Sequence, residues 1–127
     1  MGRVLGIGGV FFKSKDPGTL SNWYRDVLGL EFEDWGGIVF RPEAMAGHPG
    51  AATVFSSFGE DTDYFAPSTR EFMINLAVDD LDAILASCAT HGVDANVLPD
   101  QPNGRFAHLL DPEGTKIELW QPMPMPD

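Results

Sequence analysis

Two side chains capable of acid–base chemistry lie close together near the end of the chain. In RFAHLLDPEGTKIELWQP, residues 105–122, Glu118 lies between two apolar residues, and His108 precedes it on the same apolar background. A carboxylate and an imidazole on neighbouring strands could bind a metal ion, exchange a proton with a ligand, or form a structural ion pair. The choice among these depends on the elements that position them.

The residues between them predict a β-hairpin of defined register. The run Asp111–Thr115, DPEGT, is typical of a type I turn followed by a left-handed glycine. This turn pairs Asp111 with Thr115 and therefore places His108 opposite Glu118. One face then carries a polar and aromatic set, namely Phe106, His108, Glu118 and Trp120. The other face carries only apolar residues, namely Ala107, Leu109, Ile117 and Leu119. We expect the apolar face to pack under helices and the polar–aromatic face to line a ligand cup.

Alternation along other predicted strands adds residues to the cup. In EFMINLAVD, Met73 and Asn75 alternate with apolar residues, and in GIGGVFFKS the same holds for Phe11 and Lys13. Lys13 or Arg41 could hold an anionic group. The predicted ligand-binding residues are Phe106, Trp120, Asn75, Met73, Lys13, Phe11, Phe55 and Arg41.

The elements around these residues occur twice along the chain. Asp16 precedes a helical stripe that ends at Gly29, and Asp80 precedes a second stripe that ends at Gly92. Each stripe follows one strand-like run and precedes three more. The runs after the first stripe are residues 30–35, 37–42 and 52–58, and those after the second are 93–97, 105–110 and 115–120. The two copies are offset by a nearly constant interval, which indicates an internal repeat.

The segments DPGTLSNWYRDVLGLEF, NLAVDDLDAILASCATHGV and LLDPEGTKIELWQP, with their spacing, cover most of the chain. On these segments the chain resembles the vicinal oxygen chelate superfamily, which includes glyoxalase I, bleomycin-resistance proteins and extradiol dioxygenases. The resemblance implies an α+β fold in which two βαβββ modules form a curled mixed sheet, and it implies a homodimer. Residues 1–127 would form one glyoxalase-like domain, with modules at about 1–58 and 71–122 and an acidic linker at 59–70.

The resemblance also implies where a metal would bind. The ligand positions of metal-dependent members fall on Gly9, on Phe55 or Ser56, on Met73 and on Glu118. Only Glu118 offers a donor suited to a hard divalent metal, and catalytic zinc generally has three protein ligands. We therefore expect no cofactor; the alternative is a divalent metal (Zn, Ni, Fe or Mn) held by Glu118 with His108.

Two functions remain open. In the first, the protein is a metal-free, bleomycin-resistance-like binder that sequesters a cationic or aromatic small molecule between aromatic walls and acidic side chains. In the second, it is a lyase or isomerase of the superfamily, or a dioxygenase, in which Glu118 and His108 form the catalytic acid–base pair. An apolar cup would then raise the pKa of Glu118 toward neutrality.

Charge and composition limit the partners. The net charge is −11 with a pI near 4.4, which disfavours nucleic acid. No apolar run approaches the roughly 20 residues of a membrane helix. The single cysteine, Cys88, fits a reducing compartment, so a cytoplasmic location is expected. The expected partners are a small-molecule ligand and a second copy of the chain.

Overall fold

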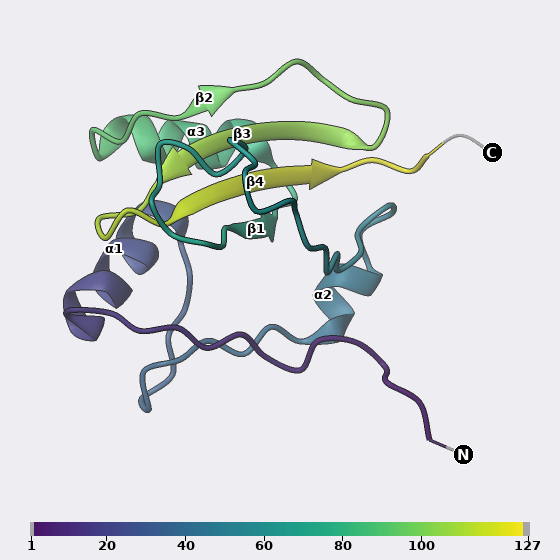
Figure 1. The fold of residues 1–127 in the computed structure, drawn as a ribbon, viewed down its shortest axis with the longest axis horizontal. Helices are drawn as coiled ribbons and strands as arrows, with labels where there is room; N and C mark the ends of the chain where they lie inside the picture. The colour runs from purple at the N-terminus through teal and green to yellow at the C-terminus, as the bar shows by residue number, and fades with distance from the viewer. Residues whose placement is uncertain (1, 126–127) are drawn as a thin grey trace.

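The computed structural model describes residues 2–125 and has an α+β architecture (Figure 1). Its elements in chain order are α1 (Pro17–Leu28), α2 (Pro42–Ala46), β1 (Ile74–Ala77), α3 (Leu81–Thr90), β2 (Asn96–Val97), β3 (Gly104–Leu110) and β4 (Lys116–Pro122). The strands form one mixed sheet in the order β1-β4-β3-β2, with β1 parallel to β4 and the other neighbours antiparallel. This curled mixed sheet confirms the predicted fold class.

The β3–β4 hairpin has the predicted register. The amide of Asp111 donates to the carbonyl of Thr115 at 2.9 Å, and the amide of Gly114 donates to the carbonyl of Asp111 at 3.0 Å. Gly114 has a φ of 84°, the left-handed conformation that the turn requires. His108 therefore lies opposite Glu118, and Phe106 lies opposite Trp120, as predicted.

The apolar face of the hairpin forms the centre of the core. Ala107, Leu109, Ile117 and Leu119 are buried there, as predicted. Two helices cover this face (Figure 1), and they contribute Leu20, Tyr24, Val27 and Leu28 from α1 and Leu81 and Cys88 from α3. Asp16 and Asp80 cap the two helices by accepting the amide hydrogens of Thr19 and Ala83. The internal repeat predicted from the sequence is therefore visible in the matching N-terminal caps of α1 and α3.

Strand β1 brings a third strand to the hairpin. Its residues pair in register with β4, so that Asn75 lies beside Glu118. Asn75 and Ala77 are exposed, whereas Ile74 and Leu76 are half-buried and pack against the core. This alternation agrees with the predicted orientation of the strand.

The strands expected in the first half are not formed in the described residues. Residues 2–13, 30–41 and 51–58 are without strand, although Val4 and Ile7 line a surface hollow together with Phe55. The only regular elements before residue 74 of the described chain are α1 and the short α2. Glycine at positions 6, 8 and 9 weakens strand formation, because it has no side chain to pack and loses the most backbone entropy. Leu30 and Phe32 pack against the core, but many other apolar side chains of these segments are exposed, with Phe11 at 93% and Phe55 at 89%.

No helix within residues 2–125 is both long enough and apolar enough to cross a membrane.

Candidate functional site

Glu118 lies at the centre of a hydrogen-bonded group on the sheet face opposite the helices. The Asn75 amide donates to Glu118 Oε1 at 2.8 Å, and His108 Nε2 lies 2.6 Å from Glu118 Oε2. The hydroxyl of Tyr64 also donates to Oε2. We call these four residues the carboxylate cluster. Only 13% of the Glu118 side chain and 10% of the His108 side chain are exposed, so the contacts are made largely away from water.

The surroundings of Glu118 favour its ionised form. Burial acts to raise the pKa of Glu118, but the hydrogen bonds from Tyr64, His108 and Asn75 and the charge of the imidazole outweigh it. The pKa of Glu118 therefore lies below its ordinary value. The expectation that the cup raises this pKa toward neutrality is wrong, because three donors converge on two carboxylate oxygens.

Tyr64 comes from residues 59–70, which lie against the sheet face opposite the helices; we call this segment the strap. The Lys116 ammonium donates to the carbonyls of Tyr64 at 2.6 Å and Ala66 at 3.0 Å. Further along, Ser68 Oγ donates to the carbonyl of Gly114, and Arg70 forms an ion pair with Glu113 at 3.7 Å. The strap is thus fixed to the β3–β4 hairpin by several polar contacts.

Sequence reasoning missed the role of Tyr64. The available signal was an aromatic pair, Tyr64 and Phe65, within an otherwise acidic segment. No periodicity specifies which strand such a segment reaches, because its turns follow neither the strand nor the helix repeat. Only the structure shows that Lys116, opposite Leu110, is buried, and the strap carbonyls supply the acceptors that a buried ammonium needs.

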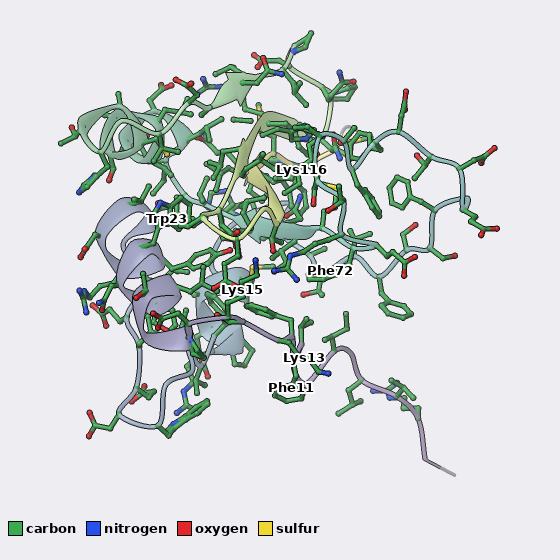
Figure 2. The ribbon with its side chains drawn as sticks, turned by 60° about the vertical axis from the view of Figure 1, so that its left-hand side comes forward. Phe11, Lys13, Lys15, Trp23, Phe72 and Lys116 are labelled. Carbon is green, nitrogen blue, oxygen red and sulfur yellow. The ribbon has the colours of Figure 1, made fainter. Side chains whose placement is uncertain are left out.

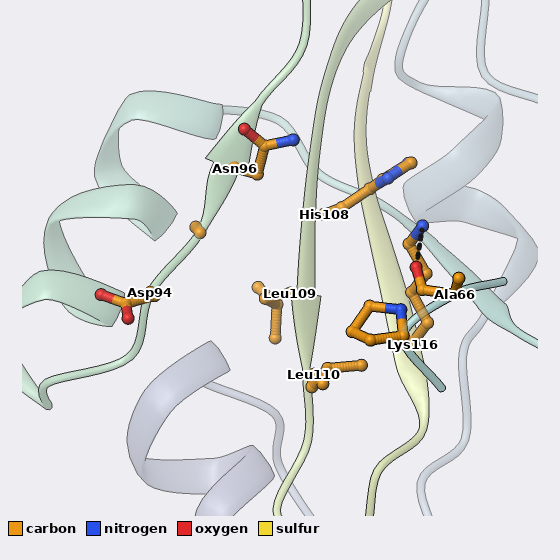
Figure 3. A pocket seen from close by; sticks show the side chains of 9 residues that line it. Ala66, Asp94, Asn96, His108, Leu109, Leu110 and Lys116 are labelled. Atoms are coloured by element: carbon orange, nitrogen blue, oxygen red, sulfur yellow. Dashed lines mark hydrogen bonds between the residues drawn. The ribbon is translucent and has the colours of Figure 1, made fainter. Parts of the chain in front are cut away.

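A pocket adjoins the carboxylate cluster between the strap, β3 and the segment that leads into β2. Its volume is about 490 Å³, which is within the range of small-molecule sites. Figure 3 shows His108 and Asn96 facing this space from neighbouring strands, with Ala66 and Lys116 on the strap side. The remaining lining residues are Pro67, Asp94, Ala95, Leu109 and Leu110. His108 therefore contacts both Glu118 and the pocket.

Two predicted aromatic residues lie on the same sheet face. The rings of Phe106 and Trp120 stack with centroids 6.2 Å apart and planes inclined by 7°. Trp120 Nε1 donates to the carbonyl of Asn103 at 3.0 Å, and only 7% of Trp120 is exposed. At Gly104, an added Cβ would lie 2.3 Å from the carbonyl oxygen of Gln121 and 2.6 Å from Trp120 Nε1. The absence of a side chain at Gly104 thus permits the observed position of Trp120.

The structure does not bring the remaining predicted residues to the cluster. Phe11, Lys13, Phe55 and Arg41 are exposed on first-half segments that form no strand. Figure 2 shows Phe11 and Lys13 on the N-terminal segment, apart from Lys116 on the sheet. Met73 lies immediately before β1 and is half-buried. The sequence-predicted set therefore divides into one group on the sheet, around Glu118, and one group away from it.

The residues present do not fit a superfamily metal centre. Gly9 and Met73 occupy two of the implied ligand positions, and the oxygens of Glu118 already accept three hydrogen bonds. Over residues 2–125, no group of three or more His, Cys, Asp or Glu side chains is arranged to hold a metal ion. Glu118 and His108 alone provide two donors where three are usual.

The glyoxalase-like domain family model matches residues 9–120, which is most of the chain. The chain belongs to the glyoxalase-like domain family. A comparison with curated protein sequences gave no match.

Solved structures agree with this family assignment at the level of fold. The structure is similar to TnmS3, an antibiotic binding protein from Streptomyces sp. CB03234, with a TM-score of 0.52 and 21% identity over 86% of this chain and 88% of the other. It is similar to a glyoxalase/bleomycin resistance protein from the same organism, with a TM-score of 0.50 and 20% identity over 84% and 92%. A protein of unknown function from Agrobacterium tumefaciens str. C58 matches with a TM-score of 0.51 and 20% identity over 94% and 100%.

Proposed function

We propose that this glyoxalase-like protein is a metal-free binder of a small molecule that carries an aromatic surface and either a positive charge or a hydrogen-bond donor. The observation that carries the proposal is the largely buried Glu118 carboxylate, which lies 2.6 Å from His108 on the wall of a pocket of about 490 Å³ and whose pKa is held below its ordinary value by its hydrogen bonds. A buried acceptor behind a cavity wall is a strong determinant of ligand choice, because a group that displaces one of its donors must donate in its place.

Two further observations support this proposal. One of the similar structures is described as an antibiotic binding protein and another as a glyoxalase/bleomycin resistance protein. The net charge of −11 would attract a cationic ligand over a long range at low salt. The stacked Phe106 and Trp120 rings add an apolar surface to the same sheet face.

The test is a tryptophan fluorescence titration with a panel of aromatic compounds, both cationic ones and neutral ones that carry a hydrogen-bond donor, followed by calorimetry for any compound that responds. We expect saturable quenching in the natural protein and a loss of about tenfold or more in affinity for Glu118→Gln, since hydrogen bonds to charged groups are the strong ones.

Glu31→Gln is the matched control, because it removes one exposed carboxylate from the first half and changes the net charge by the same amount as Glu118→Gln. If both variants weaken binding to the same extent, the affinity comes from electrostatic attraction to the whole acidic surface and not from the Glu118 site. A flat titration across the whole panel would overturn the proposal.

A second candidate is proton transfer by the His108–Glu118 pair, which the 2.6 Å contact favours. In this function His108 is the better base, because a Glu118 pKa held below its ordinary value makes this carboxylate a weak proton acceptor. Glu118 would then orient the imidazole. The test is exchange of a substrate proton next to a carbonyl, which His108→Gln should abolish and Asn75→Ala should largely preserve.

We also propose a homodimer. The exposed large apolar side chains of the first half, which include Val4, Leu5, Phe11 and Phe55, support this because monomers rarely expose contiguous apolar patches, and Val4, Ile7 and Phe55 line one surface hollow. Light scattering at increasing protein concentration should give twice the chain mass of 13.8 kDa. A constant monomer mass would contradict it.

A further inference from the structure

The ring of Tyr64 covers Glu118 although it belongs to no regular element. Three members of the carboxylate cluster lie on strands: Asn75 on β1, His108 on β3 and Glu118 on β4. Tyr64 lies on the strap and is 38% exposed, so its side chain forms the solvent side of the cluster. Among the four, Tyr64 is the member that can leave without breaking a strand ladder.

The backbone of the strap is fixed at Tyr64, so only the side chain of this residue is free to change its position. Lys116 holds the carbonyls of Tyr64 and Ala66, which flank Phe65 on both sides. The turns of the strap are closed by the amide of Thr62 donating to Gly59 and the amide of Ala66 donating to Asp63. A change of rotamer at Tyr64 would expose Glu118 while these contacts remain.

The groups around the Tyr64 side chain determine which kind of ligand group could take its place. Its ring stacks on Phe58, with centroids 5.5 Å apart and planes inclined by 21°, and meets the His108 ring edge-on at 5.4 Å. The Lys116 ammonium lies 5.2 Å from the centre of the Tyr64 ring. A cation beside the ring favours an electron-rich aromatic group, and the carboxylate at its end favours a hydroxyl or amine donor.

We propose that Tyr64 is a gate whose phenol occupies the ligand subsite, so that the ligand displaces it with an electron-rich aromatic ring carrying its own hydrogen-bond donor. This inference rests on the proposed function and names the part of the ligand that Glu118 receives. The side chain of Tyr64 then acts as an internal competitor, and any population of the closed state lowers the apparent affinity. A phenolic group is the closest match, because it reproduces both the ring and the donor of Tyr64.

The test uses p-cresol, which has the structure of the tyrosine side chain, and 4-methylanisole, in which the hydroxyl is methylated and cannot donate. Amide shifts of residues 118 and 119 in ¹H–¹⁵N spectra give the dissociation constants. We expect Tyr64→Phe to bind p-cresol several-fold more tightly than the natural protein, because the closed state has lost its hydrogen bond to Glu118. Tyr64→Ala should bind it more tightly still and prefer it to 4-methylanisole by about tenfold or more.

Phe40→Ala is the matched control, since it removes an exposed aromatic ring from the first half. It should leave the p-cresol affinity unchanged. The gate would be overturned if neither Tyr64 variant bound p-cresol more tightly than the natural protein does. Equal affinity of Tyr64→Ala for p-cresol and for 4-methylanisole would also overturn it. If cationic aromatic compounds still bind the natural protein in a Glu118-dependent manner, the proposed function stands while the gate fails. If no compound binds even to Tyr64→Ala, both fail.

Discussion

The two halves of this chain share a sequence pattern but differ in the structure they form. After residue 70, a strand, a helix and three further strands appear, and the β3–β4 hairpin has the expected register. Before residue 59, the matching pattern yields α1 and the short α2, while the expected strands are without ladder partners in the described residues. The helix starts are nevertheless built alike, with Asp16 and Asp80 each accepting the amide hydrogen of the residue three positions later.

This difference shows what each element depends on. A helix satisfies its own backbone and needs only a cap and an apolar stripe, so both copies form. A strand needs a partner, and the second half supplies one locally through the DPEGT turn. In the first half, the turn at residues 33–37 closes with the amide of Glu33 donating to Gly37 at 2.8 Å, yet no ladder follows it in the described chain.

The largest contrast between the halves should appear in the core. Ile117→Ala removes a side chain with 0% exposure from β4 and should lower the free energy of unfolding by about 2–5 kcal/mol. Val54→Ala removes a β-branched side chain that is 74% exposed and should change it by less than about 0.5 kcal/mol. Urea unfolding followed by circular dichroism measures both. A comparable loss for Val54→Ala would mean that Val54 itself is packed in the proposed dimer.

The sequence predicted the hairpin, the helices and the cluster pair, because each depends on contacts between residues close in the chain or on a strict alternation. His108 and Glu118 follow from a single turn, and Asn75 follows from the strand alternation. Tyr64 could not be predicted, since its position depends on Lys116 and Ser68 anchoring the strap across the sheet. The first-half strands were overpredicted, because a β pattern alone does not supply the partner that a strand needs.

One buried contact joins the two halves and should have the next largest effect. The Tyr24 hydroxyl on α1 donates to Asp111 Oδ2 at 2.6 Å, and burial together with this bond raises the pKa of Tyr24. Tyr24→Phe should cost about 1.5–3 kcal/mol of unfolding free energy, the range for a bond to a charged group. Tyr64→Phe is the control, because its ring is more exposed and should cost less. Equal costs would argue against a special role for the α1–hairpin contact.

The two helix caps test whether the halves unfold together. Asp16→Ala and Asp80→Ala each remove one capping acceptor and should each cost about 1 kcal/mol. Asp16→Asn and Asp80→Asn keep an acceptor and should recover most of the loss. Thermal unfolding monitored at 222 nm gives all four values. If the change at Asp16 leaves the main transition unaltered while that at Asp80 lowers it, α1 is only loosely coupled to the sheet.

The carboxylate cluster should make the stability of the second half depend on pH. The folded-state pKa of Glu118 lies below the ordinary value of 4.5, despite burial, because Tyr64, His108 and Asn75 donate to the carboxylate. Its contribution to stability is therefore complete above pH 4.5 and is lost as the pH falls through the lower folded-state pKa. Glu118→Gln should lower the free energy of unfolding at neutral pH, because one carboxylate oxygen becomes an NH2 group that cannot accept the bonds made there, and it should flatten the acid slope of the unfolding free energy. Glu31→Gln, an exposed carboxylate of the first half, should leave that slope unchanged. Denaturant unfolding at a series of acid pH values separates the two, and an unchanged slope in Glu118→Gln would show that the cluster does not stabilise the ionised carboxylate.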